Sequence, residues 1–198
     1  MMYPGSGFGQ CLRLFCLAAT LVCATSAVHA DDYAPVERLL RDGQLAQAMD
    51  KADQYLATNP RDPQMRFLKG LIQQDSGQRE AAVTTYETLI QDYPELPEPY
   101  NNVAVLYAQQ GQFEKARASL EMAIRNRRSY ATAYENLGDV YVRLAIDAYR
   151  QAQHNDAGNT TVAPKLALTR QIITSAAPAA PTPAAARSST RMAPTARR

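Results

Sequence analysis

Residues 99–126 read PYNNVAVLYAQQGQFEKARASLEMAIRN, and the fold can be predicted from this segment. Its apolar residues keep helical spacing on both sides of Gly111, with Val103 and Leu106 before the glycine and Ala116 and Leu120 after it. A glycine between two such segments favours the positive φ that ends a helix. The stretch therefore predicts two helices joined by a tight turn.

The same pattern recurs along the chain at a period of 34 residues. Gly43, Gly77 and Gly111 are each followed by glutamine, and an alanine comes five residues after each glycine. Other markers at this spacing are Gly70, Ala104 and Gly138; Pro60 and Pro94; Tyr100 and Tyr134; Tyr107 and Tyr141. Because so many matches at one period do not arise by chance, the chain is predicted to be a helical repeat protein.

Each recurring residue type has a physical use. Small residues at positions 70, 104 and 138 are expected where the two helices of one repeat approach closely. The alanines at 48, 82 and 116 let the second helix pack against the first. Pro60 and Pro94 are expected to stop the second helix and turn the chain into the next repeat.

The period and these residues resemble the tetratricopeptide-repeat (TPR) family, with Tyr100, Ala104, Tyr107, Gly111 and Ala116 in the best-matched repeat. The resemblance implies an all-α, right-handed superhelix, or α-solenoid. It would hold about three full repeats, a shortened fourth and a capping helix. Most members of the family bind peptides or partner proteins in the concave groove of this superhelix.

The repeats are expected at about residues 32–62, 63–96, 97–130 and 131–159, in a domain spanning 31–174. The fourth departs from the pattern, because no glycine stands where Gly111 did and a second-helix pattern, Ala145 to Ala152, arrives five residues early. We therefore expect one long helix from Thr132 to about His154. A capping helix is expected at 162–174, with Leu166, Leu168 and Ile172 as its apolar residues.

The first 30 residues are predicted to be a signal peptide. Arg13 supplies a positive charge, residues 14–24 are apolar, and Ala30 ends a segment suited to cleavage before Asp31. A membrane anchor is the alternative, but the apolar run is shorter than the ~20 residues a spanning helix needs. A lipoprotein site at Cys23 is disfavoured by the preceding Val22, and residues 1–10 could stem from a misplaced start codon.

Charge and cysteine content fit an exported chain. All three cysteines fall within the predicted signal peptide, so the mature protein needs no disulfide and offers no thiolate site. All 19 acidic residues lie at or after Asp31, whereas residues 175–198 are rich in Ala and Pro and carry arginines without an acid. This tail is predicted to be disordered, with no selected role or with an affinity for anionic polymers of the cell envelope.

The resemblance also implies which residues line the groove, because fixed positions of each first helix face it. The site residues predicted in this way are Phe67, Leu71, Asn101, Asn102, Val105, Gln109, Asn136, Asp139 and Arg143. Phe67, Leu71 and Val105 would form an apolar floor. Asn102 and Asn136 would pair with the main chain of an extended peptide.

Two alternatives stay open for these residues: Phe67 could be tucked under the second helix of the preceding repeat, and the asparagines could simply face water. One binding mode is excluded. Family members that grip a C-terminal carboxylate need several cations and asparagines at set positions, and only Asn102 matches.

The sequence offers no sign of an enzyme. After removal of the predicted signal peptide, His154 would be the single histidine left, and it is expected to lie at the C-terminal end of a helix. No phosphate loop, catalytic triad or metal-ligand spacing occurs. Glu135 and Asp139 share one face of a helix and are expected to line the groove as acidic residues rather than to bind a metal. We expect no cofactor, no metal, no nucleic-acid partner and no membrane span after signal cleavage.

The expected function is a periplasmic or cell-envelope scaffold that binds a peptide or partner protein in the groove. One alternative is a structural, self-associating protein that uses the open repeat edge or the long fourth helix, with an incidental groove. Another is an envelope accessory that uses its basic tail.

Overall fold

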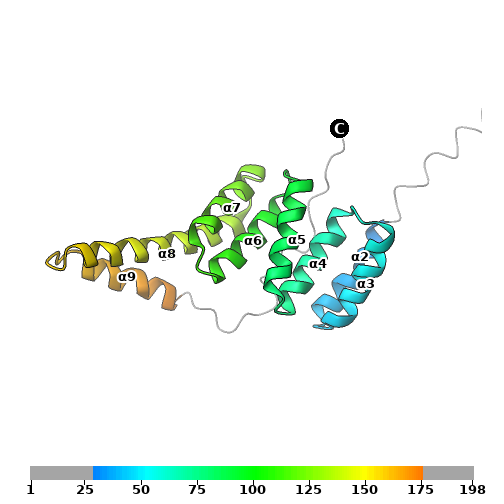
Figure 1. Cartoon of the computed structure of the whole chain (residues 1–198), viewed down its shortest axis with the longest axis horizontal. Coiled ribbons are helices and arrows are strands. Elements are labelled where there is room, and N and C mark those ends of the chain that lie inside the picture. Colours follow the sequence, from blue (N-terminus) through cyan, green and yellow to red (C-terminus); the bar gives the residue numbers. More distant parts are fainter. Residues whose placement is uncertain (1–28, 176–198) are drawn as a thin grey trace, which may run out of the picture.

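The computed structural model describes residues 29–175, which are almost entirely helical and contain no strand (Figure 1). Within this range the helices, labelled as in Figure 1, are α2 (His29–Arg41), α3 (Leu45–Thr58), α4 (Pro63–Asp75), α5 (Arg79–Asp92), α6 (Pro97–Gln109), α7 (Phe113–Asn126), α8 (Ala131–Asn155) and α9 (Val162–Ser175). The fold is therefore all-α, as expected.

The helices pack in chain order, each against the next one (Figure 1). The hairpins α2–α3, α4–α5 and α6–α7 stack side by side, and first helices of neighbouring hairpins also touch, as α2 does with α4 and α6 with α8. Contacts thus connect neighbours along the row, which is the arrangement of a solenoid.

Glycine ends the first helix of each of the three hairpins. Gly43, Gly77 and Gly111 have φ values of 72°, 76° and 73°, a region that costs other residues energy. After α6, the backbone N–H of Gln112 donates to the carbonyl of Tyr107 at 2.8 Å, which satisfies an end carbonyl of the helix. The predicted role of these glycines is confirmed.

Prolines and an aspartate mark the entry to the first helices. Pro63 and Pro97 are the first residues of α4 and α6, where the missing N–H of proline costs nothing. Asp62 caps α4, because its carboxylate accepts the backbone N–H of Met65 at 2.7 Å.

The core lies between the two helices of each hairpin and between adjacent hairpins. Ala82, Ala104 and Ala116 have no exposed surface. A Cβ atom on Gly70 would lie 2.4 Å from the ring of Tyr86, so α4 and α5 approach as closely there as the sequence predicts.

Gly138 differs from its repeat equivalents, and the expectation of a close helix contact there is wrong. It is exposed, and a Cβ atom built on it meets nothing within 4 Å. The physical reason lies in α8, which runs on without a turn, so that no second helix returns across Gly138.

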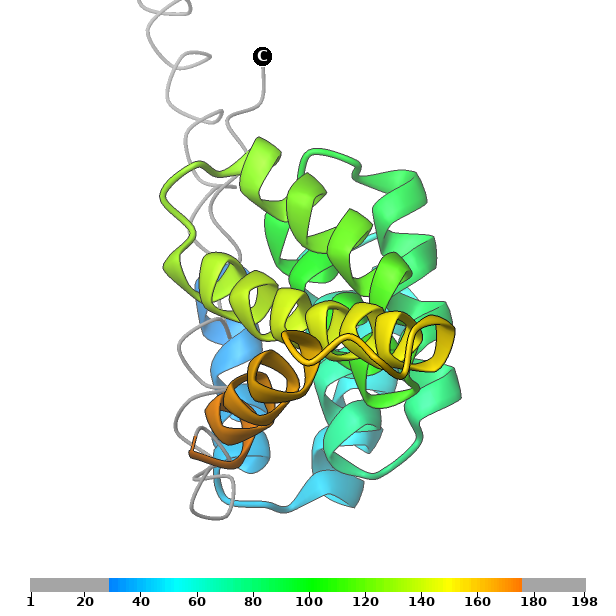
Figure 2. The same ribbon diagram turned by 90° about the vertical axis from the view of Figure 1, so that its left-hand side faces the viewer.

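The last two helices form an end that differs from the other hairpins. The long helix expected from Thr132 to about His154 is present as α8, and α9 packs against it (Figure 2). Val162 and Leu166 of α9 are buried, but Leu168 and Ile172 are 63% and 49% exposed. Of the three apolar residues expected in the capping helix, only Leu166 is therefore buried.

Two predicted segments, the signal peptide and the basic tail, lie largely outside residues 29–175. Within that range no helix is long and apolar enough to cross a membrane.

Candidate functional site

A cleft of about 490 Å³ lies between α6, α7 and α8. It is lined by Ala104, Val105, Ala108, Gln109, Gly111, Phe113, Leu120, Asn136, Asp139, Val140 and Arg143. Five of the nine site residues predicted from the sequence belong to this lining. They are Val105, Gln109, Asn136, Asp139 and Arg143.

Helical spacing brings these side chains together. Val105 and Gln109 are four residues apart on α6, and Asn136, Asp139 and Arg143 follow each other at intervals of three and four on α8. Residues at such intervals share one face of a helix. Short side chains at positions 104 and 108 leave space on the α6 side of the cleft.

The floor of the cleft is apolar and its rim is charged. Val105 is partly exposed, and Phe113 lies beside it at the start of α7. Asp139 and Arg143 are exposed, and neither has an ion-pair partner among residues 32–173. This part of the surface can meet apolar groups together with charges of either sign.

The asparagines are arranged differently from the prediction. Asn136 donates its side-chain N–H to the side-chain oxygen of Asn101 at 2.9 Å, and Asn101 is buried. Asn102 does not line the cleft, since its amide donates to the carbonyl of Glu98 on its own helix at 2.9 Å. The expected pair of equivalent peptide clamps at Asn102 and Asn136 is thus wrong as to geometry.

Asn101 instead joins adjacent repeats, because it accepts from α8 while lying on α6. Asn136 itself lines the cleft, and within residues 32–173 its own amide oxygen accepts no hydrogen bond. That oxygen can accept a main-chain N–H from a bound segment.

Phe67 and Leu71 are core residues, so the predicted exposed floor does not extend to α4. Phe67 has no exposed surface and packs on the ring of Tyr86, with the two ring centres 5.9 Å apart. Leu71 is 5% exposed. Gly70 provides the room that Tyr86 occupies, and the ring then covers Phe67 one turn earlier on α4.

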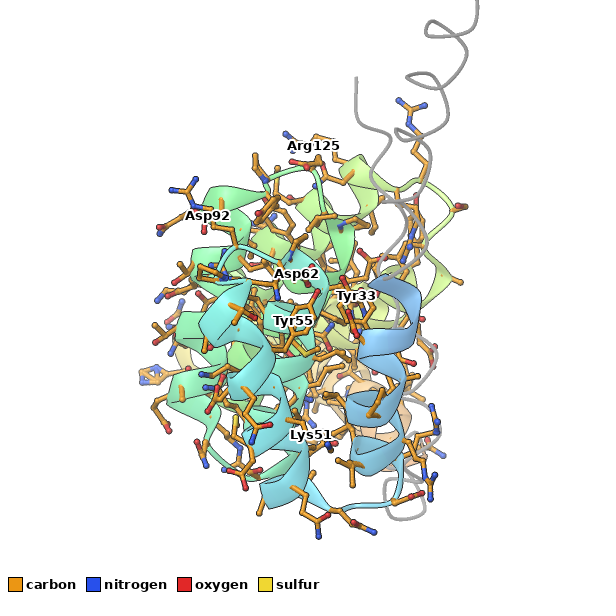
Figure 3. The ribbon with its side chains drawn as sticks, turned by 90° about the vertical axis from the view of Figure 1, so that its right-hand side faces the viewer. Tyr33, Lys51, Tyr55, Asp62, Asp92 and Arg125 are labelled. Atoms are coloured by element: carbon orange, nitrogen blue, oxygen red, sulfur yellow. The ribbon has the colours of Figure 1, made fainter. Side chains whose placement is uncertain are left out.

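Two polar contacts near the hairpin junctions are structural. Glu98 is fully buried, and one of its oxygens accepts from Arg127 at 2.7 Å. Tyr33 of α2 donates to Asp62 at 2.7 Å and lies beside Tyr55 (Figure 3). Burial, followed by the bond to Asp62, raises the pKa of Tyr33 well above its ordinary value.

A second hollow, of about 340 Å³, adjoins the cleft between α7, α8 and α9. It shares Phe113 and Arg143 with the cleft and adds Arg150 and Arg170. Phe113 connects the two spaces, and the sequence reasoning missed it because it considered first helices alone. No group of three or more metal-binding side chains occurs in the part of the chain that the structure describes.

Comparison with known proteins identifies the repeats. Residues 106–145 match a model described as TPR repeat, and residues 65–95 match one described as tetratricopeptide repeat. The first match spans the turn at Gly111, both sides of the cleft and the first half of α8. These two segments therefore carry tetratricopeptide repeats.

One curated relative is the tetratricopeptide repeat domain-containing protein PYG7, chloroplastic, of Arabidopsis thaliana. It is 32% identical over 79 residues, which cover 37% of this chain and 26% of PYG7. The chain thus spans about a quarter of the length of that relative.

Solved structures with a similar fold include two of the protein MamA. The match to the crystal structure of MamA covers 81% of this chain and 85% of the MamA chain, at 17% identity and a TM-score of 0.53. The match to the MamA RS-1 ArsTM double mutant covers 70% of this chain and 80% of the mutant chain, at 20% identity and the same TM-score. At this level of identity the likeness concerns the fold alone, which is a TPR-type α-solenoid.

Proposed function

We propose that this chain is a protein-interaction scaffold that holds an extended segment of a partner protein in the cleft between α6 and α8. The observation that carries the proposal is the convergence of Val105, Gln109, Asn136, Asp139 and Arg143 on one hollow. Repeat solenoids commonly use extended concave surfaces for binding.

The chemistry of the cleft indicates what the segment would look like. Val105 and Phe113 offer an apolar floor, which suits a small or medium apolar side chain. Asn136 presents an acceptor for a main-chain N–H, and Asp139 and Arg143 can pair with a basic and an acidic side chain. A peptide that alternates apolar and charged residues fits this arrangement.

We also propose that the chain is exported and acts in the periplasm or elsewhere in the cell envelope. Support comes from the apolar stretch at 14–24, the small residue at Ala30 and the confinement of all three cysteines to the first 23 residues. The proposal for the cleft does not depend on this location.

Photo-crosslinking from within the cleft tests the binding proposal. A photoreactive side chain is placed at Val105 or at Gln109, and an envelope extract is irradiated with the purified protein. Both positions line the cleft, so both should capture the same partner, and mass spectrometry of the product identifies the captured segment.

The matched control carries the same group at Val83, a partly buried position on α5 outside the cleft lining. It should capture none of that partner. Capture from Val83 as strong as from Val105 would place the binding surface elsewhere on the solenoid.

A further inference from the structure

One stripe of α8 is apolar, uncharged and unpartnered over much of its length. It consists of Tyr134, Gly138, Tyr141, Ala145, Ala148 and Ala152. These residues are alternately four and three apart, which puts them on one side of the helix in the spacing of a two-helix seam. Tyr134 and Tyr141 are 52% and 48% exposed, which is unusual for such large side chains.

The N-terminal half of this stripe corresponds to a face that neighbouring helices cover in the preceding repeat, but here it is left uncovered. Tyr100, Ala104 and Tyr107 occupy the equivalent positions of α6, which packs against both α5 and α7, and all three are buried. Gly138 corresponds to Ala104, yet a Cβ atom on it would meet nothing within 4 Å.

The C-terminal half of the stripe resembles the small-residue face of α7, the second helix of its hairpin. Ala145, Ala148 and Ala152 supply small side chains there, as Ala116 and Ala123 do on α7. Since α8 is one continuous helix, its two halves cannot fold back on each other. The large side chains and the small side chains that would pack against each other therefore both lie on α8, where they cannot meet within one molecule.

We infer that α8 pairs with α8 of a second copy of this chain, in antiparallel orientation about a two-fold axis at the level of residue 143. In this register Tyr134 lies opposite Ala152 of the second copy. Gly138 then lies opposite Ala148, and Tyr141 opposite Ala145. Each large side chain meets a small one, which is how Tyr86 already packs over Gly70 within the molecule.

The surroundings of α8 leave room for the second copy. The C-terminal half of α8 projects beyond α7 (Figure 1). Ala148, Gln151 and Asn155 are exposed along this half, on the side where α7 of the second copy would come to lie. The two halves of each stripe are self-complementary, as a two-fold interface requires.

The size of the stripe sets the strength of the pairing. From Tyr134 to Ala152 it is about 27 Å long at the rise of an α-helix. A single helix pair of this length lies at or below about 1,200 Å² of buried surface, where interfaces are weak and transient. The dimer is accordingly expected at micromolar and higher concentrations. It uses a different side of α8 from the cleft and does not rest on the proposed function.

Sedimentation equilibrium of the purified protein over a wide concentration range tests the pairing. The parent should pass from monomer to dimer. Gly138→Leu should raise the dissociation constant at least about tenfold, because the added side chain overpacks the contact with Ala148. The monomer should keep its fold, since the space at Gly138 is open. Leu168→Ser, at another exposed apolar side chain on α9, is the matched control and should leave the dimer unchanged.

A complementation experiment tests the register. Gly138→Glu and Ala148→Lys should each weaken the dimer alone, and an equimolar mixture should restore it through one Glu–Lys contact per dimer. Three results would each overturn the inference. In the first, the parent stays monomeric at every concentration. In the second, Gly138→Leu leaves the dissociation constant of the dimer unchanged, and in the third, the mixture dimerises no more strongly than either variant alone. In the first case a helix of another protein becomes the candidate occupant of the stripe.

Discussion

At the scale of single residues, the same repeat position serves two different purposes. Gly70 and Gly138 are equivalent in the repeat, and only Gly70 has a neighbouring ring in contact range. Residue type alone shows that the position can accept a close neighbour. Whether a neighbour is present depends on the helix that follows.

This difference predicts opposite effects of one substitution. Gly70→Ala should destabilise the fold by about 1–3 kcal/mol, because the added methyl group collides with the Tyr86 ring. Gly138→Ala should stabilise it by about 0.5–1 kcal/mol, because alanine costs less backbone entropy in a helix. Denaturant unfolding at low protein concentration measures both. Equal effects of the two substitutions would contradict the arrangement of α8.

At the scale of helices, most boundaries could be predicted from the sequence. The glycine turns, the ends of α3 and α5 before Pro60 and Pro94, and the long fourth helix follow from local chemistry. Positive φ and a missing N–H restrict the backbone wherever they occur. The expected ends of the long helix, Thr132 and His154, lie within one residue of α8 as observed.

The details of the candidate site were less predictable. Phe67 and Asn102 occupy groove positions by register, but Phe67 is covered by Tyr86 and Asn102 bonds to its own helix. Register fixes the direction of a side chain, whereas its exposure depends on the size of neighbours from another helix. Phe113 was missed for a related reason, since it enters the cleft from a second helix.

A further prediction concerns the start of α4. Asp62 accepts the backbone N–H of Met65 and the hydroxyl of Tyr33, so it both caps α4 and ties α2 to it (Figure 3). Asp62→Ala removes both bonds and should cost about 1–3 kcal/mol of unfolding free energy. Thermal or urea unfolding provides the measurement.

Asp62→Asn is the matched control, because an asparagine oxygen still caps the helix. It should retain most of the stability. If the Ala and Asn variants unfold together with the parent, the contacts at this junction contribute nothing to the fold.

At the scale of the whole molecule, the row of hairpins presents two separate surfaces at the α8 end. The cleft uses Asn136, Asp139 and Arg143, while the apolar stripe uses Tyr134 and Tyr141 on another side of the same helix. The proposed partner binding and the proposed self-association should therefore respond independently to substitution.

The proposed export predicts a defined N-terminus. Protein isolated from its native envelope fraction should begin at Asp31, because cleavage after Ala30 removes the predicted signal peptide. Intact-mass spectrometry reads this directly. A mature pool that retains residues 1–30 would refute the proposed signal peptide and leave the cleft untouched.

Calorimetric titration of the captured partner segment into Val105→Asp tests whether the cleft is the binding site. Val105 lies on the apolar side of the cleft, and a carboxylate there must be desolvated when the segment binds, which should cost about 1–3 kcal/mol or more. Val83→Asp introduces the same change outside the cleft lining. Val105→Asp should lose at least about tenfold in affinity, while Val83→Asp should bind like the parent. Both variants should keep the circular dichroism of the parent. Undiminished binding by a folded Val105→Asp protein would contradict the proposed binding in the cleft.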